Sequence, residues 1–254
     1  MNRAAQGASL LRLDGVGKRF PSGVTAVEDL HLDIAQGDFL ALLGPSGCGK
    51  STLLRMIAGL IEPSAGRLAW QADVTGQLGF VFQEPTLMPW ASALRNVALP
   101  LELAGIPRAE AERRARESLA RVDLTGFEAA YPRMLSGGMK MRVSIARALV
   151  TRPRLLLMDE PFAALDEITR HRLNEDLLRL WQDERFTAIF VTHSTFESVF
   201  LAERIIVMSP RPGRITEELR IPPEDRVTPE FRTSDIYAAH CRAVSHALTA
   251  AMAA

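Results

Sequence analysis

A glycine-rich stretch follows a short apolar run near residue 40. It reads Gly44-Pro45-Ser46-Gly47-Cys48-Gly49-Lys50-Ser51-Thr52 and matches the phosphate-binding pattern G-x-x-x-x-G-K-[ST]. The glycines allow backbone N–H groups to point inward around phosphate oxygens, Lys50 offers a mobile cation, and Ser51 can ligate Mg²⁺. A helix that starts after the loop would add the positive end of its dipole. The stretch therefore predicts a binding loop for the phosphates of a nucleotide.

A second apolar run ends in two carboxylates. Leu-Leu-Leu-Met at 155–158 is followed by Asp159 and Glu160. If this run is a buried parallel strand, both carboxylates lie at the carboxyl edge of the sheet, where ligands collect. Asp159 would then hold Mg²⁺ through water, and Glu160 would orient and deprotonate an attacking water. The alternative is a pair that only caps the next helix, but the phosphate-binding loop favours the catalytic interpretation.

The elements that must position these groups can be predicted from periodicity. Alternating apolar residues near 10–14, 30–34 and 66–70 indicate an N-terminal antiparallel sheet. Continuous apolar runs indicate parallel strands that are covered on both faces, and they lie at 39–43, 78–82, 154–158, 187–191 and 204–208.

Helical patterns lie between these runs, so strand and helix alternate as in a parallel α/β core. Two apolar helix faces are formed by Ala111, Ala115, Leu119 and Val122, and by Leu173, Leu177, Leu180 and Trp181. Glu117 and Arg121 have the spacing of an exposed i,i+4 ion pair. Further helices are predicted at 138–150 and from Asp235 to Leu248.

A serine and two glycines lie between the phosphate-binding loop and the Asp159-Glu160 pair. By themselves, Ser136, Gly137 and Gly138 predict either a second backbone anion cradle or a plain helix N-cap. In its context, Leu135-Ser136-Gly137-Gly138-Met139 resembles the LSGGQ signature of the ATP-binding-cassette (ABC) ATPases. Met139 departs from the usual glutamine, whose side-chain hydrogen bonds it cannot make.

The resemblance covers residues 10–218 and implies an α/β fold. That fold is a P-loop NTPase (RecA-like) parallel core with an N-terminal antiparallel β subdomain and an inserted α-helical subdomain at about 86–150. Residues 219–254 would form a short C-terminal helical extension. The resemblance also implies that Phe20 stacks on adenine, that Gln83 contacts Mg²⁺ and water, that Asp166 belongs to the D-loop, and that His193 touches the γ-phosphate.

In such ATPases the phosphate loop of one subunit and the signature of another enclose each ATP. The resemblance therefore implies a second ABC ATPase subunit as partner, with a homodimer expected. The phrases FQEPTLMPW, LSGGMKMRVSIARAL, LMDEPFAALDEITR and MSPRPGRI resemble importer ATPases for nitrate, sulfonates, taurine and pyrimidine precursors. We then expect membrane permease subunits as partners, a solute-binding protein as an indirect partner, and a peripheral place at the cytoplasmic face of the inner membrane. This chain's sequence does not indicate which solute is transported.

Two local questions stay open in the sequence. Leu87, Met88 and Trp90 form either a surface for a coupling helix of a permease or part of the interior of the helical subdomain. Cys48 is read as a small filler of the loop, in preference to a redox sensor.

Composition limits the alternatives. The chain has 254 residues, of which 47% are hydrophobic and 24% charged, and its 30 basic residues balance its 30 acidic ones. Zero net charge argues against nucleic acid as the main partner, and therefore against a soluble ABC ATPase that remodels nucleic acid or ribosomes. A small-molecule kinase would lack Ser136-Gly137-Gly138. Glu160 and His193 argue against a module that barely hydrolyses, and the sequence has no apolar stretch long enough for a membrane span.

Overall fold

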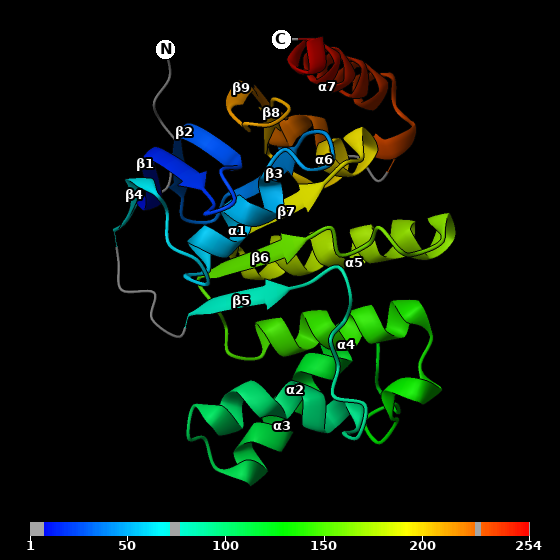
Figure 1. The fold of residues 1–254 in the computed structure, drawn as a ribbon. Helices are drawn as coiled ribbons and strands as arrows, with labels where there is room; N and C mark the ends of the chain where they lie inside the picture. The colour runs from blue at the N-terminus through cyan, green and yellow to red at the C-terminus, as the bar shows by residue number, and fades with distance from the viewer. Residues whose placement is uncertain (1–7, 72–76, 227–229, 254) are drawn as a thin grey trace. The chain divides into compact units, whose positions relative to one another are not determined.

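The computed structural model describes residues 8–71, 77–226 and 230–253. The chain divides into two compact units. Unit 1 comprises residues 1–74 and 187–254, and unit 2 comprises residues 75–186. The elements of each unit are labelled in Figure 1.

Unit 1 contains the antiparallel sheet predicted from the period-two patterns. Strand β1 (Ser9–Arg19) lies between β2 (Thr25–Ala35) and β4 (Ala65–Trp70) and is antiparallel to both. Leu30, Leu32 and Ile34 of β2 are buried, while His31 and Asp33 between them are exposed. This alternation confirms the predicted half-buried strand, because one face of the sheet meets the core and the other meets water.

The second sheet of unit 1 is built from the continuous apolar runs. Strand β3 (Phe39–Leu43) lies between the parallel strands β7 (Thr187–Thr192) and β8 (Arg204–Met208). Every residue of these three strands is buried, as expected for parallel strands covered on both faces. The edge strand β9 (Ile215–Arg220) is antiparallel to β8 and was not predicted, because its sequence ITEELR is polar and largely exposed.

Three α-helices complete unit 1 in the described residues. They are α1 (Lys50–Ile57), α6 (Thr195–Leu201) and α7 (Asp235–Ala253), with short 3-10 turns η2 (Pro223–Arg226) and η3 (Phe231–Thr233) before α7. Helix α7 extends beyond the predicted end at Leu248 and buries one face, which carries Tyr237, Cys241, Val244, Ala247 and Ala251. The Tyr237 hydroxyl donates to the Phe196 carbonyl of α6 at 2.9 Å, which ties the last helix to the unit.

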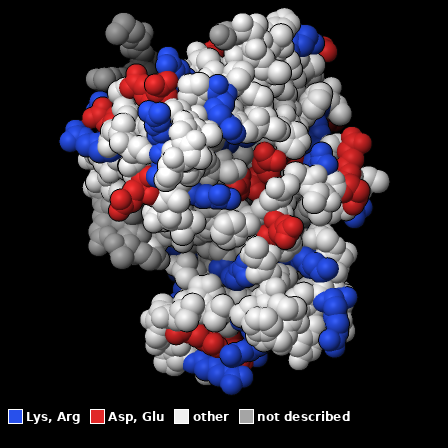
Figure 2. Space-filling view, viewed as in Figure 1, with Lys and Arg blue, Asp and Glu red and all other residues white. Residues whose placement is uncertain are grey.

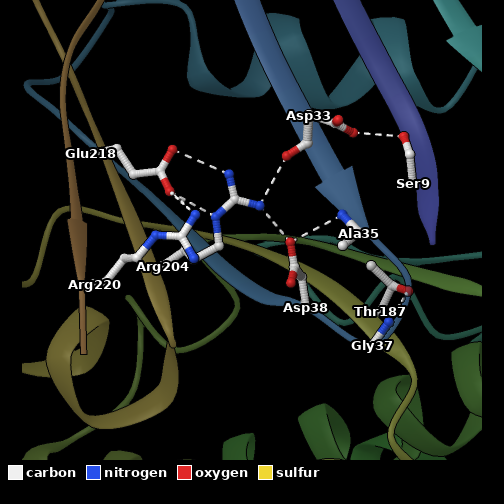
Figure 3. A network of polar contacts seen from close by, with 9 residues as sticks. All are labelled: Ser9, Asp33, Ala35, Gly37, Asp38, Thr187, Arg204, Glu218 and Arg220. Carbon is white, nitrogen blue, oxygen red and sulfur yellow. Dashed lines mark hydrogen bonds and ion pairs between the residues drawn. The ribbon is translucent and has the colours of Figure 1, made fainter. Parts of the chain in front are cut away.

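A network of polar contacts joins strands of unit 1 (Figure 3). Arg204 is only 9% exposed in β8, and its guanidinium donates to both carboxylate oxygens of Glu218 at 2.9 and 3.1 Å. It also donates to Asp38 at 2.5 Å and to the Asp33 carbonyl at 2.9 Å. Because its charge is paired twice and hydrogen-bonded, this buried arginine is compatible with an otherwise apolar strand.

Unit 2 contains one parallel strand pair and four α-helices in its described part. Strand β5 (Leu78–Val81) pairs with β6 (Leu155–Asp159). The helices are α2 (Ala93–Leu103), α3 (Arg108–Arg121), α4 (Gly137–Leu149) and α5 (Glu167–Glu184), with a 3-10 turn η1 (Pro132–Met134) before α4. The two apolar helix faces predicted around Ala111 to Val122 and Leu173 to Trp181 are buried.

The predicted ion pair between Glu117 and Arg121 is wrong. Glu117 instead pairs with Arg113, four residues before it, at 2.5 Å. Arg121 pairs with Glu184 of α5 at 2.8 Å. A long arginine side chain can reach several acids, and sequence spacing on one helix does not reveal partners supplied by another helix.

The surface carries both charge signs. On the face drawn in Figure 2, Lys and Arg side chains lie among Asp and Glu side chains. No helix in the part of the chain that the structure describes is long and apolar enough to cross a membrane.

Candidate active site

The glycine-rich loop lies in unit 1 between β3 and α1. Gly47 and Gly49 have φ of 77° and 105°, which L residues with side chains rarely adopt. A Cβ atom on Gly49 would lie 2.4 Å from Val27 Cγ1 and 2.7 Å from the Ala26 carbonyl oxygen. Gly49 is also the N-cap of α1, and no side chain caps the helix there. The backbone N–H groups at this N-terminus therefore form a site that suits an anion.

Lys50 brings a positive charge into the loop. It is 4% exposed, and its Nζ donates to the carbonyl oxygens of Gly44 and Pro45 at 2.7 and 2.9 Å. Cys48 is 1% exposed, with its Sγ 3.8 Å from Lys50 Nζ. Burial inside the loop is in keeping with the interpretation of Cys48 as a small filler. Of the remaining loop residues, Ser46 is exposed, and Ser51 and Thr52 are half-buried in the first turn of α1.

The loop also contacts the segment 209–214, which connects β8 to β9. Arg211 donates from Nε and Nη2 to the Gly47 carbonyl oxygen at 3.1 and 2.9 Å. A Cβ atom on Gly213 would lie 1.9 Å from the Cys48 carbonyl oxygen, so the two backbones are in direct contact. From the sequence, MSPRPGRI is only a marker of resemblance, and its pattern predicts no role for Arg211.

Two further predicted site residues belong to unit 1. His193 is exposed and follows β7, and Thr192 before it pairs in register with Leu43, the last residue of β3. His193 and the glycine-rich loop therefore start from the same edge of the sheet, at the carboxyl ends of neighbouring parallel strands. Phe20 is half-buried just after β1, with Lys18 Nζ 5.5 Å from its ring centroid.

The two predicted carboxylates lie at the end of β6 in unit 2. Leu155 to Met158 are buried, whereas Asp159 and Glu160 are half-buried. Glu160 has φ of 48°, a left-handed conformation that is uncommon for a residue with a side chain and that concentrates at functional sites. Val81 of β5 pairs with Met158, so Gln83 follows β5 at the same edge where β6 ends in Asp159 and Glu160.

The signature turn, residues Ser136 to Gly138, forms the N-terminus of α4. Ser136 is the N-cap, and its Oγ accepts from the Met139 N–H at 3.3 Å. A Cβ atom on Gly138 would lie 2.6 Å from Thr169 Cγ2, which shows how closely the first turns of α4 and α5 approach. Asp166 caps α5 by accepting from the Thr169 N–H at 2.9 Å, and this backbone hydrogen bond lowers the pKa of the Asp166 carboxyl. Unit 2 thus places Leu165 and Thr169, which lie on either side of Asp166 in the sequence, next to Gly137 and Gly138.

The irregular segment after Gln83 is held by two side chains that the sequence analysis did not single out. Arg147 of α4 donates to the carbonyl oxygens of Pro85 and Thr86, both at 2.9 Å, and to the Thr86 hydroxyl at 3.0 Å. Burial lowers the pKa of Arg147. Asn96 of α2 is fully buried, accepts from the Met88 N–H at 2.7 Å and donates to the carbonyls of Met88, Ala91 and Ser92. The sequence feature that could have revealed Arg147 and Asn96 is a polar residue on the buried face of a predicted helix.

The exposure of the segment's apolar residues differs along it. Trp90 is 75% exposed, while Leu87 and Met88 are half-buried. Trp90 therefore carries most of the apolar surface that the segment presents to solvent.

Comparisons with known proteins agree on one family. Residues 27–163 match the family model described as ABC transporter. An ABC transporter ATP-binding protein of Methanocaldococcus jannaschii is 49% identical over 215 residues, which cover 82% of this chain and 80% of that protein. The taurine import ATP-binding protein TauB of Pseudomonas entomophila is 46% identical over 218 residues, or 84% of each chain. The solved dimeric post-hydrolysis state of the ATP-binding cassette MJ0796, bound to ADP and phosphate, is 33% identical with a TM-score of 0.73 and covers 84% of this chain and 99% of that chain.

Proposed function

The chain belongs to the ABC transporter family as an ATP-binding and hydrolysing subunit of an importer, and on this premise we propose which residues carry out each step. Residues 10–218 form the ATPase domain, with the helical subdomain at about 86–150. Residues 219–254 act as a packing extension, which the buried face of α7 supports.

ATP binds to the glycine-rich loop through its phosphates. The observation that carries this proposal is the N-terminus of α1, which follows glycines of positive φ and has no side-chain cap. Residues Gly44 to Thr52 surround the phosphates and, except for Pro45, offer backbone N–H groups to them. Lys50 moves from its own loop carbonyls to the outer phosphates. Phe20 stacks on the adenine, since stacking requires only an aromatic face.

Hydrolysis depends on positioning and on charge neutralisation. Glu160 orients the attacking water and accepts its proton, while His193 donates to the γ-phosphate and Gln83 orients the water. Ser51, Asp159 and Gln83 would hold Mg²⁺, which neutralises charge on the phosphates when bound. The described residues contain no group of three or more His, Cys, Asp or Glu side chains able to hold a metal. Such a group is not needed here, because Mg²⁺ in phosphate sites takes only one or two protein carboxylates together with phosphate oxygens and water.

The signature turn acts on a second subunit. Ser136, Gly137 and Gly138 bind the ATP held by the glycine-rich loop of the partner, and Asp166 lies at the same interface. The dimeric form of the MJ0796 cassette supports a homodimer. ATP binds the closed dimer more tightly than the open one through its γ-phosphate contacts. Hydrolysis removes these contacts, and the dimer then opens.

The solute passes through partner subunits in the membrane, so this chain works peripherally at the cytoplasmic face of the inner membrane. Trp90, with Leu87 and Met88, forms the surface that receives a permease, and the exposure of Trp90 supports this role. Because TauB is a taurine import protein, we propose a small solute of the sulfonate or nitrate type, delivered by a solute-binding protein.

Glu160→Gln tests the catalytic assignment. The amide cannot take the proton of water, so we expect Mg-ATP binding and dimerisation to persist while turnover falls by about 1,000-fold, within the range for loss of a general base. Size-exclusion chromatography with Mg-ATP and phosphate release measure the two properties. Glu167→Gln is the matched control, because it makes the same chemical change at an exposed position of α5. Normal steady-state hydrolysis by Glu160→Gln would show that Glu160 is not the base.

Trp90→Ala tests the permease surface. We expect the isolated subunit to keep its ATPase rate, while less of it is recovered with a polytopic membrane protein from native membranes. Leu103→Ala, which truncates a residue 79% exposed in α2, is the control. Equal recovery of both variants with that membrane protein would remove Trp90 from the proposed surface.

A further inference from the structure

The segment 209–214, here called the β8–β9 loop, is built against the glycine-rich loop. Gly213 donates its N–H to the Ala26 carbonyl at 2.9 Å, and its own carbonyl accepts from the Glu28 N–H at 3.0 Å. The Cys48 carbonyl oxygen lies so close to the Cα of Gly213 that no Cβ fits between them. These contacts fix the β8–β9 loop by its backbone, and they deliver the side chain of Arg211 to the Gly47 carbonyl.

We propose that Arg211 is a positioning residue for nucleotide binding, which holds the Gly47 carbonyl away from the phosphate cradle and adds a positive charge beside it. The proposal rests on the assignment of the glycine-rich loop as the ATP site. It adds to that site a residue of the β8–β9 loop, which lies 164 positions from Gly47 in the sequence.

The peptide group after Gly47 needs such a restraint. Gly47 has φ of 77° and no Cβ, so rotation of this peptide meets little steric resistance. Its own N–H, on Cys48, is held only by a long hydrogen bond to the Pro45 carbonyl at 3.3 Å. A rotated peptide would turn its carbonyl dipole toward the phosphates and repel them. Two N–H donors of one guanidinium on the carbonyl oxygen favour the orientation in which the oxygen points away from the cradle.

Lys50 cannot replace this restraint during binding. Its Nζ lies on the carbonyl oxygens of Gly44 and Pro45, and the proposed function moves that ammonium group to the phosphates. The contact from Arg211 comes from outside the loop and reaches a different carbonyl. It can therefore persist while Lys50 changes partners.

No carboxylate pairs with Arg211 in the part of the chain that the structure describes. Its guanidinium instead makes two hydrogen bonds to the Gly47 carbonyl oxygen. Arg214 of the same loop differs, since its Nη2 lies 2.6 Å from Glu28 Oε2. A guanidinium without a carboxylate partner adds to the attraction for a polyphosphate, whereas a paired one adds little.

The test compares Arg211→Met, Arg211→Lys and the control Arg214→Met in the full chain. Arg211→Met keeps the aliphatic stem but loses the donors and the charge, and Arg214→Met makes the same change without touching the glycine-rich loop. We expect Arg211→Met to raise the Kd for Mg-ADP and the KM for ATP by about tenfold, with kcat at saturation unchanged within about twofold. Arg211→Lys should recover part of the loss through its charge, and Arg214→Met should match wild type.

Thermal unfolding without nucleotide separates positioning from folding. We expect the Tm of Arg211→Met to equal that of Arg214→Met within about 2 °C. Wild-type Kd in Arg211→Met, an equal loss in Arg214→Met, or a loss of binding matched by a large fall in Tm would overturn the role of Arg211. Failure of the wild-type protein itself to bind Mg-ADP would instead refute the proposed ATP site.

Discussion

The two glycine-containing turns of this chain begin helices in opposite ways. In unit 1, Gly49 precedes α1 with φ of 105° and no side-chain cap. In unit 2, Ser136 precedes α4 and caps it through its hydroxyl, and neither Gly137 nor Gly138 has positive φ. The difference indicates that the first turn requires its glycines to hold an unusual backbone open to an anion. The second turn requires Gly138 for close approach to another helix, and Ser136 already caps its N-terminus.

The two turns also differ in how a phosphate could bind to them. A phosphate at α1 meets N–H groups that no side chain occupies. A phosphate at α4 must share the Ser136 hydroxyl, which now accepts from Met139. We therefore expect the turn in unit 1 to bind nucleotide within one subunit, and the turn in unit 2 to contribute only when a second subunit brings its nucleotide.

The largest effect is expected from Gly49→Ala. The new Cβ would meet Val27 and the backbone of Ala26, and alanine would be strained at φ of 105°. Strain and overpacking together should lower the free energy of unfolding by about 2–5 kcal/mol and abolish Mg-ADP binding. Urea unfolding and calorimetric titration measure the two effects.

Gly59→Ala is the matched control for that substitution. Gly59 has φ of 71°, but nothing lies within 4 Å of the position of a new Cβ. It should cost only about 1–2 kcal/mol and leave nucleotide binding intact. Equal costs at Gly49 and Gly59 would show that backbone conformation alone, without the contact to Val27, explains the glycine at 49.

Gly138→Ala should have a smaller effect. Alanine favours a helix over glycine by about 0.5–1 kcal/mol, but its Cβ would lie 2.6 Å from Thr169 Cγ2. We expect a net loss of about 1–2 kcal/mol in urea unfolding. Gly137→Ala, whose Cβ would meet Leu165 at an ordinary 3.4 Å, should be neutral or stabilising.

The double substitution Gly138→Ala with Thr169→Ser tests the cause. Serine keeps the hydroxyl of Thr169 and removes the methyl group that the new Cβ would meet. The two changes should therefore be coupled favourably by about 1 kcal/mol. Strict additivity would mean that the glycine is not needed for the approach of α5.

Ser136→Ala separates capping from nucleotide binding. Loss of the cap should cost about 1 kcal/mol of stability. The isolated subunit should bind Mg-ADP with wild-type Kd, while ATP-dependent dimerisation in the Glu160→Gln background should weaken. If Ser136→Ala lost Mg-ADP binding in the monomer, the distinction between the two turns would be wrong.

The two regions also differ in how far the sequence predicts them. The glycine-rich loop could be predicted because its residue types follow one another in the sequence, and the buried runs that flank it are equally local. The conformation of the segment after Gln83 could not be predicted. It is held by Asn96 from α2 and by Arg147, which is 61 and 62 positions from the residues that it contacts.

The other failures have the same origin. Strand β9 exists because its backbone pairs with β8, whereas its own polar sequence gives no strand signal. Arg121 pairs with Glu184 of another helix, which no spacing within α3 could indicate. The contact of Arg211 with Gly47 likewise depends on a distant loop. Local pattern therefore predicted the residues to which we assign the chemistry, but not those that hold them in place.

The smallest effect concerns Asp166, whose side chain caps α5 as Ser136 caps α4, but with a charge. Its accepted hydrogen bond from the Thr169 N–H lowers the pKa of the carboxyl below the ordinary value of 3.8, so the folded state favours the carboxylate. A group with a depressed folded pKa contributes stability that is present above its unfolded pKa and is lost as pH falls through the folded pKa.

In Asp166→Asn the amide oxygen can still cap the helix but does not titrate. The stability difference between wild type and Asp166→Asn should therefore be constant near neutral pH and shift against wild type below about pH 4, as measured by urea unfolding at a series of pH values. A difference that does not change with pH would show that the charge of Asp166 adds nothing to its role as a cap.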